Sequence, residues 1–302
     1  MTSSPHVVAV GGGHGLAATI RAVRRYAART TAVVTTADDG GSTGRLRSGL
    51  PLPAPGDLRR CLAAMADPYR DGGGGPPARP LAAALEYRFG GTDVEGHALG
   101  NLLLAALTQA TGDFVEAVDE VGRMLGLDPT TARVLPATAE PVVLRARTRA
   151  GDEIEGQVAV SRARDIDRVE LRPAGACAPP AALKALLDAD QVVLGPGSLF
   201  TSVLAAAVVD DVRRAIAASG GRCVYVCNLR AEVAEAAGYD VAAHVAALRR
   251  HGVEPDVVVT QRGGLPVGDP GVEVVEADVA RPNGLAHDSG RLAAVLARLA
   301  EV

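Results

Sequence analysis

Aromatic residues are scarce in this chain: tryptophan is absent, and only 3% of the 302 positions are aromatic. The formal net charge at pH 7 is −4. Proteins that bind nucleic acid usually present aromatic platforms on which bases stack, or a basic surface that contacts the phosphates. The sequence shows neither feature, so we expect no nucleic acid among its partners.

Long apolar runs are absent as well. No run approaches the roughly 18 residues that a membrane-spanning helix needs. The first ten residues, MTSSPHVVAV, lack the charged region and apolar core of a secretory signal. We therefore expect no membrane span and a cytoplasmic protein. The hydrophobic content of 48% is nevertheless sufficient for a substantial globular core at this length.

Cysteine is also rare. The four cysteines, Cys61, Cys177, Cys223 and Cys227, do not have the spacing of a zinc ribbon. We interpret them as buried thiols in preference to metal ligands or redox groups.

Short apolar runs and helical patterns alternate along most of the chain. The run VVAV is followed by the turn GGGHG, by a helical pattern with Leu16, Ile20 and Val23 on one face, and by the run TAVV. Such a βαβ unit requires parallel pairing and a right-handed crossover. The later runs QVVL, CVYV, DVVVT and EVVEADV continue the pattern. We predict an α/β fold with a doubly wound, Rossmann-like parallel sheet, in a single domain of residues 1–302.

One segment has a different pattern. Residues 136–173 alternate apolar and charged side chains around an AGD turn, which predicts a small antiparallel insertion with one exposed face. Helices are expected over residues 57–66, with Asp57 as the N-cap, and from Asp288 to near the end of the chain. The stretch DGGGGPPARP, residues 71–80, is expected to be an exposed connection.

Polar turns follow four of the predicted strands: GGGHG, DDGGSTGR, GPGSLFTS and CNLRAE. In doubly wound sheets, ligands bind outside the carboxyl ends of the strands, where helix N-termini direct their amides into a crevice. The sequence therefore predicts a ligand site formed by these turns.

The first turn fits a phosphate. Gly11, Gly12, Gly13 and Gly15 would let the backbone approach the ligand, and the helix that follows favours negative charge. Residues 13–18 also fit the dinucleotide pattern GxGxxA, with Asp38 at a suitable distance for a ribose hydroxyl, so NAD is an alternative ligand. A tight βα connection without any ligand is the other interpretation.

The second turn fits a metal or a sugar. Asp38 and Asp39 are the kind of carboxylates that hold Mg²⁺ together with phosphate oxygens, and they can also accept hydrogen bonds from ribose. Gly40 and Gly41 would permit close approach, and Arg45 would bind phosphate. The alternative is a solvated turn in which an aspartate caps a helix.

The third turn, GPGS, comprises Gly195, Pro196, Gly197 and Ser198. With Thr201 it would form an anion nest at a helix start, unless these hydroxyls only cap the helix. His97 and Asn101 lie four residues apart and share one face of a predicted helix, with either a structural or a ligand role.

Several segments in order resemble one known family. They include VVAVGGGHGLAATIRAVRRY, TAVVTTADDGGSTGRLR, APGDLRRCLAAMA, GHALGNLLLAALTQATGDFVEAV, VVLGPGSLFTSVL and GYDVAAHVAAL. Together they are similar to the gluconeogenesis factor (YvcK-like) family, a branch of the CofD-like superfamily, from about residue 6 to residue 251. The chain departs from the family pattern at His14, where threonine is commoner, in CNLRAEVAEAAGYD, and near residues 260–280, which look shortened.

The resemblance implies a cytoplasmic regulator that binds UDP-sugars such as UDP-N-acetylglucosamine. It also implies a role in growth and cell shape on gluconeogenic carbon sources, and links to proteins of cell-wall synthesis. CofD relatives are metal-dependent transferases that build a phosphodiester onto a deazaflavin, so a transferase is the alternative. The scarcity of aromatic residues favours the regulator, and we expect a homo-oligomer.

The resemblance also assigns residues. Tyr239, in GYDVAAH, matches a family segment that contacts the nucleotide-sugar, and Arg281 is the candidate for an arginine that the family uses near the C-terminus. The full set of expected ligand-binding residues, with Asp38 and Asp39 also as metal ligands, is Gly11, Gly12, Gly13, Gly15, Asp38, Asp39, Gly40, Gly41, Ser42, Arg45, Asp57, Asn101, Gly195, Pro196, Gly197, Ser198, Thr201, Asn228, Tyr239 and Arg281.

Overall fold

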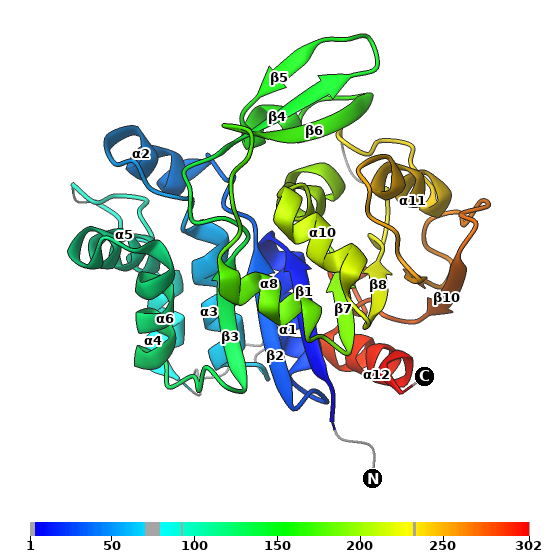
Figure 1. The fold of residues 1–302 in the computed structure, drawn as a ribbon, viewed down its shortest axis with the longest axis horizontal. Coiled ribbons are helices and arrows are strands. Elements are labelled where there is room, and N and C mark those ends of the chain that lie inside the picture. Colours follow the sequence, from blue (N-terminus) through cyan, green and yellow to red (C-terminus); the bar gives the residue numbers. More distant parts are fainter. Residues whose placement is uncertain (1–3, 70–78, 92, 232–233, 302) are drawn as a thin grey trace.

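A seven-stranded sheet forms the centre of the protein (Figure 1). The computed structural model describes residues 4–69, 79–91, 93–231 and 234–301. The strand order is β10-β9-β8-β7-β1-β2-β3, and every pair of neighbours is parallel. The strands are β1 (His6–Gly11), β2 (Arg29–Val34), β3 (Ala132–Pro136), β7 (Gln191–Leu194), β8 (Arg222–Val226), β9 (Val257–Gln261) and β10 (Glu273–Ala277).

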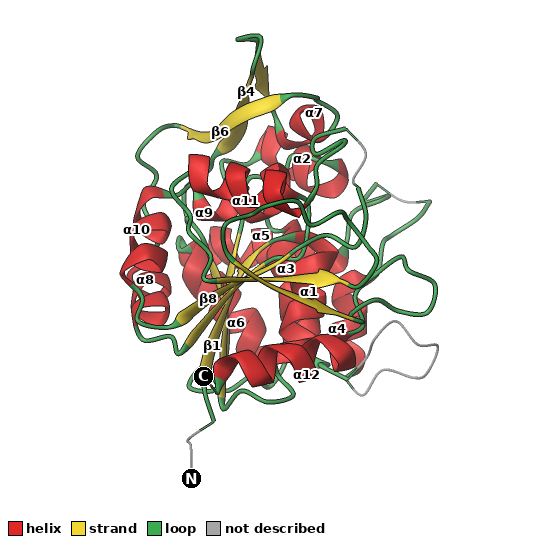
Figure 2. Ribbon diagram, turned by 90° about the vertical axis from the view of Figure 1, so that its right-hand side faces the viewer, coloured by secondary structure: helices red, strands yellow, loops and turns green. Residues whose placement is uncertain are grey.

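Both faces of this sheet are buried, which explains why its central strands are continuous apolar runs. On β1, Val8 and Val10 pack into the core that contains α8, α10 and α11, whereas Val7 and Ala9 face the side of α1, α3 and α12. Figure 2 shows helices on both sides of the sheet. The helices of the main domain are α1 (Gly13–Val23), α2 (Gly41–Gly49), α3 (Gly56–Ala66), α4 (Pro80–Glu86), α5 (Leu99–Thr111), α6 (Phe114–Met124), α8 (Pro180–Leu187), the π-helical segment η1 (Leu199–Leu204), α9 (Ala205–Ala207), α10 (Asp210–Ala218), α11 (Val241–Arg250) and α12 (Ser289–Ala300).

A small antiparallel sheet lies beyond the carboxyl ends of the central strands (Figure 1). It consists of β4 (Val143–Thr148), β5 (Glu153–Glu155) and β6 (Ile166–Arg172), with the short helix α7 (Gln157–Ser161) between β5 and β6. On β4, Leu144 and Ala146 are buried, and Arg147 between Ala146 and Thr148 is exposed. This alternation is the pattern that predicted the insertion.

The predicted Rossmann-like sheet and its antiparallel insertion are confirmed, with several local differences. Residues after Asp39 form the helix α2 instead of an open turn. Asp57 lies inside the first turn of α3 and does not cap it, because Pro55 is the N-cap residue. Asp288 does cap α12, since its side chain accepts the Arg291 amide at 2.9 Å.

Other expectations have mixed outcomes. Three of the cysteines are buried, but Cys177 is exposed. Most of the glycine-rich stretch 71–80 lies outside the described residues, and Pro80 already begins α4. Within the described part of the chain, no helix has both the length and the apolarity needed to cross a membrane.

Candidate functional site

The strand order reverses at β1, which lies between β2 and β7. At such a point the connections that follow the neighbouring strands diverge to opposite faces and leave a crevice. The structure has a cleft of about 590 Å³ there. Its walls come from the loops after β1, β7 and β8, from α7 and from the segment before α12: His14, Gly15, Ala18, Ser161, Pro196, Gly197, Ser198, Asn228, Leu229, Arg230, Ala231, Glu235, Leu285, Ala286 and His287.

The loops after β1 and β7 pack directly against each other. A Cβ atom on Gly15 would lie 2.1 Å from the carbonyl oxygen of Pro196, so only glycine fits at this contact. Thr19 of α1 donates a hydrogen bond to the Gly195 carbonyl at 2.6 Å. Gly13 has a φ of +67°, in the left-handed region that glycine adopts without strain. These contacts fix the start of α1 at the edge of the cleft, where its first amides have no partner within the helix.

The start of η1 already binds a carboxylate of the protein itself. Glu235 is 2% exposed and accepts hydrogen bonds from the Phe200 amide at 3.2 Å and from the Thr201 hydroxyl at 2.8 Å. The anion nest predicted from Ser198 and Thr201 is therefore occupied in part by Glu235. The start of α1 is the other helix start at this cleft, and the Asp57 carboxylate accepts its first amide, that of Gly13.

Charged side chains of both signs lie near the start of α1. Desolvation lowers the pKa of His14, and the nearby guanidinium groups of Arg60, Arg59 and Arg21 lower it further, while Glu86 opposes them. His14 is thus neutral at pH 7, and two of these arginines are paired, Arg60 with Asp57 and Arg59 with Glu86.

Asp57, in the first turn of α3, lies against the glycine turn after β1. Asp57 is paired with Arg60 at 2.6 Å and accepts a hydrogen bond from the Gly13 amide. Burial raises the pKa of Asp57, Arg60 opposes the shift, and Asp38 adds to it. A Cβ on Gly12 would lie 2.5 Å from an Asp57 carboxylate oxygen, so the absence of a side chain there makes room for Asp57.

The two aspartates after β2 have different partners. Asp39 accepts a hydrogen bond from the Val158 amide of α7 at 2.9 Å, whereas Asp38 accepts one from the Gly40 amide at 3.0 Å. Among the described residues, no group of three or more histidine, cysteine, aspartate or glutamate side chains could hold a metal ion. Mg²⁺ commonly takes one or two carboxylates plus phosphate oxygens and water, and each of these aspartates accepts one backbone amide on a single carboxylate oxygen.

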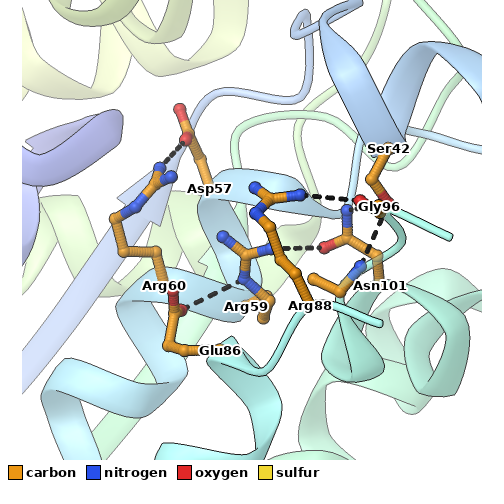
Figure 3. A network of polar contacts seen from close by, with 9 residues as sticks. Ser42, Asp57, Arg59, Arg60, Glu86, Arg88, Gly96 and Asn101 are labelled. Carbon is orange, nitrogen blue, oxygen red and sulfur yellow. Dashed lines mark hydrogen bonds and ion pairs between the residues drawn. The ribbon is translucent and has the colours of Figure 1, made fainter. Parts of the chain in front are cut away.

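Ser42 and Asn101 belong to a buried polar network (Figure 3). Asn101 donates to the Ser42 hydroxyl at 3.0 Å and accepts from Arg59 at 3.3 Å, and Arg59 pairs with Glu86 at 3.1 Å. His97 contacts the same hydroxyl at 3.1 Å. These residues join α2, α3, α4 and α5, so their partners are supplied by the protein.

Three further predicted residues do not line the cleft. Arg45 is exposed and donates to the Glu95 carbonyl at 2.7 Å. Tyr239 packs edge-on against Phe200, with ring centroids 6.2 Å apart. The Arg281 amide donates to the Ala286 carbonyl at 2.8 Å and so closes the turn that carries Leu285, Ala286 and His287 into the cleft.

The structure thus brings together Gly15, the Pro196–Ser198 turn and Asn228 from the predicted set. Glu235 and His287 also line the cleft and were not predicted from the sequence. His287 directly precedes the helix cap Asp288, and a polar residue just before a cap is too common to indicate a site. Glu235 lies in a segment that departs from the family pattern, so the sequence offered no template for its role.

Comparison with known proteins gives consistent similarities. A model of the family described as 2-phospho-L-lactate transferase CofD matches residues 7–282. The chain is 42% identical over 309 residues to a putative gluconeogenesis factor of Mycobacterium tuberculosis (strain CDC 1551 / Oshkosh), which covers 96% of this chain and 89% of that protein. It is 38% identical over 254 residues to the gluconeogenesis factor of Bacillus subtilis (strain 168), covering 83% and 76% of the two chains. A crystal structure of a UPF0052 family member from Bacillus halodurans superposes with a TM-score of 0.87 at 30% identity, over 98% of this chain and 99% of that one.

Proposed function

Because the chain belongs to the CofD family, in the branch of the gluconeogenesis factors, we propose that it is a regulator that binds a UDP-sugar in the cleft beside β1. UDP-N-acetylglucosamine is the expected ligand. In this proposal the protein acts in the cytoplasm, as a homo-oligomer that reports the ligand to proteins of cell-wall synthesis. Growth and cell shape on gluconeogenic carbon sources would then depend on it.

One observation carries the proposal. The loops after β1, β7 and β8 converge on a single cleft of about 590 Å³, the size range of small-molecule sites. The start of α1 supplies backbone amides, and Arg59, Arg60 and Arg21 lie close enough to affect the charge of His14. In this proposal the diphosphate binds at the start of α1, and the remaining parts of the ligand lie along the β8 loop.

A transferase is the second candidate, because the matching family model is described as a transferase. Asp38 would then hold Mg²⁺ beside the phosphates, and the metal would stabilise charge on the transferred group. Asp57 would lie near the same ion, because the charge of Asp38 acts on the Asp57 carboxylate and raises its pKa. NAD⁺ is the alternative ligand, and its binding is compared with that of the UDP-sugar in the test below.

Calorimetric titration with UDP-N-acetylglucosamine and with NAD⁺, each with and without Mg²⁺, tests the proposal. We expect the UDP-sugar to bind and to be recovered intact. Binding of NAD⁺ alone would replace the ligand assignment, and sustained release of UDP would establish the transferase instead of the regulator.

A further inference from the structure

Two buried polar atoms in residues that line the cleft have no partner among the described residues. Asn228 and His287 are each 7% exposed, and both line the cleft. Within the described residues, Nδ2 of Asn228 and Nε2 of His287 make no hydrogen bond. Leaving such a buried atom unpaired is unfavourable. Unpaired atoms in a ligand cleft therefore indicate where a ligand forms hydrogen bonds.

The chemical role of each atom is fixed by its neighbours. A ring nitrogen of His287 hydrogen-bonds the Cys227 carbonyl, and because Nε2 has no partner, this nitrogen is Nδ1. Nδ1 must carry the proton to donate to a carbonyl, so Nε2 of the neutral ring is an acceptor. Burial lowers the pKa of His287 to about 4, which keeps the ring neutral at physiological pH.

Asn228 has the opposite polarity. Its Oδ1 accepts the Gly197 amide at 3.4 Å, which orients the side chain and leaves Nδ2 as a donor. Asn228 follows Cys227 in the chain, and Cys227 holds His287 through its carbonyl. Asn228 and His287 both lie in the wall of the cleft and therefore carry a buried hydrogen-bond donor and a buried acceptor at positions joined through Cys227.

We propose that Asn228 and His287 form a recognition pair for a neutral part of the ligand that carries a donor and an acceptor side by side. The proposal rests on the UDP-sugar function above and adds specificity to it. Phosphate oxygens are excluded as the partner of His287, because at neutral pH they have no proton to donate. The N3–H and a carbonyl of uracil satisfy the pair, as do two hydroxyl or amide groups of the sugar.

Two substitutions at His287 separate recognition from structure. His287→Asn keeps a short amide N–H that can donate to the Cys227 carbonyl, but it removes the acceptor at the position of Nε2. His287→Gln extends an amide to that position and loses the short donor. We expect His287→Asn to weaken UDP-N-acetylglucosamine binding about tenfold to a hundredfold, and His287→Gln to retain affinity within about threefold.

The result that overturns the recognition pair is an affinity for His287→Asn that equals or exceeds that of His287→Gln, while the wild type binds normally. Absence of binding by the wild type would overturn the proposed function itself, and the recognition pair with it. Circular dichroism and urea unfolding of both variants identify any loss of binding that comes from misfolding. If both variants misfold, Asn228→Asp provides the readout, because it keeps the acceptor for Gly197 and removes the donor; the titration is made at high salt, which screens the charge that aspartate adds.

Titration with UDP alone identifies the part of the ligand that is recognised. If the pair reads the base, His287→Asn weakens UDP and UDP-N-acetylglucosamine by the same factor. If the pair reads the sugar, only the UDP-sugar loses affinity. An unchanged affinity for both ligands would overturn the proposal.

Discussion

Gly15 lacks the Cβ atom that would otherwise lie 2.1 Å from the Pro196 carbonyl oxygen. The sequence suggested that the glycines of GGGHG admit a phosphate. The structure shows that Gly12 makes room for Asp57 and that Gly15 makes room for Pro196. Of Gly12, Gly13 and Gly15, only Gly13 has a φ in the left-handed region. At the scale of single residues, the motif joins the two loops of the cleft and positions the start of α1.

We predict that Gly15→Ala destabilises the protein by about 1–3 kcal/mol, because the new methyl group meets backbone that cannot move without displacing the turn after β7. Gly49→Ala in α2 is the matched control, since nothing lies within 4 Å of its Cβ position. The control should leave stability unchanged or raise it by up to about 1 kcal/mol, because alanine favours a helix over glycine. Urea unfolding of the two variants and the wild type measures the difference, and equal effects would show that the contact carries no strain.

The candidate site could be predicted from the sequence only in part, and particular residues show why. Strand ends are visible as apolar runs followed by polar turns, so the location of the crevice followed from the pattern. The partners of Asp39, Asn101 and Arg45 come from α7, α3 and the loop before α5. Those partners are distant in sequence, and residue type alone cannot show that a polar group is already satisfied.

At the scale of elements, the insertion is attached to the acidic loop, which is the Asp38–Asp39 segment after β2. Asp39 accepts the Val158 amide in the first turn of α7, and Arg47 donates to the Asp38 and Val142 carbonyls at 2.9 and 2.5 Å. Ser161, at the end of α7, lines the cleft. The acidic loop therefore positions one wall of the cleft, in addition to any role with a metal.

Asp39→Ala and Asp38→Asn should have different effects. Asp39→Ala removes the acceptor for Val158, so we expect α7 amides to exchange with deuterium about fivefold faster, and the Mg²⁺ dependence of UDP-sugar binding to stay as in the wild type. Asp38→Asn should leave α7 exchange unchanged and reduce the Mg²⁺ dependence. Hydrogen exchange and calorimetry with and without Mg²⁺ measure both effects. The reverse assignment would place the metal on Asp39 and overturn this interpretation.

At the scale of the whole molecule, the sheet and its helices enclose several histidines. Burial lowers the pKa of His6, His244, His251 and His287. His251 must stay neutral in the folded state, because its Nε2 accepts the Val169 amide of the insertion at 2.9 Å. These groups connect the stability of the main domain and of its insertion to pH.

Acidification should therefore destabilise the protein between pH 6.5 and pH 4. A histidine whose folded pKa lies below its unfolded value of 6.5 takes up its proton more readily on unfolding, so its contribution is present above pH 6.5 and is lost as the pH falls. For His287, with a folded pKa of about 4, the loss is about 2 kcal/mol at pH 5. Urea unfolding at pH 7 and pH 5 measures it. The His287→Gln variant has no titratable group at this position. Its free energy of unfolding should therefore fall by about 2 kcal/mol less than that of the wild type between pH 7 and pH 5. An equal fall in both proteins would mean that His287 is not buried in its neutral form.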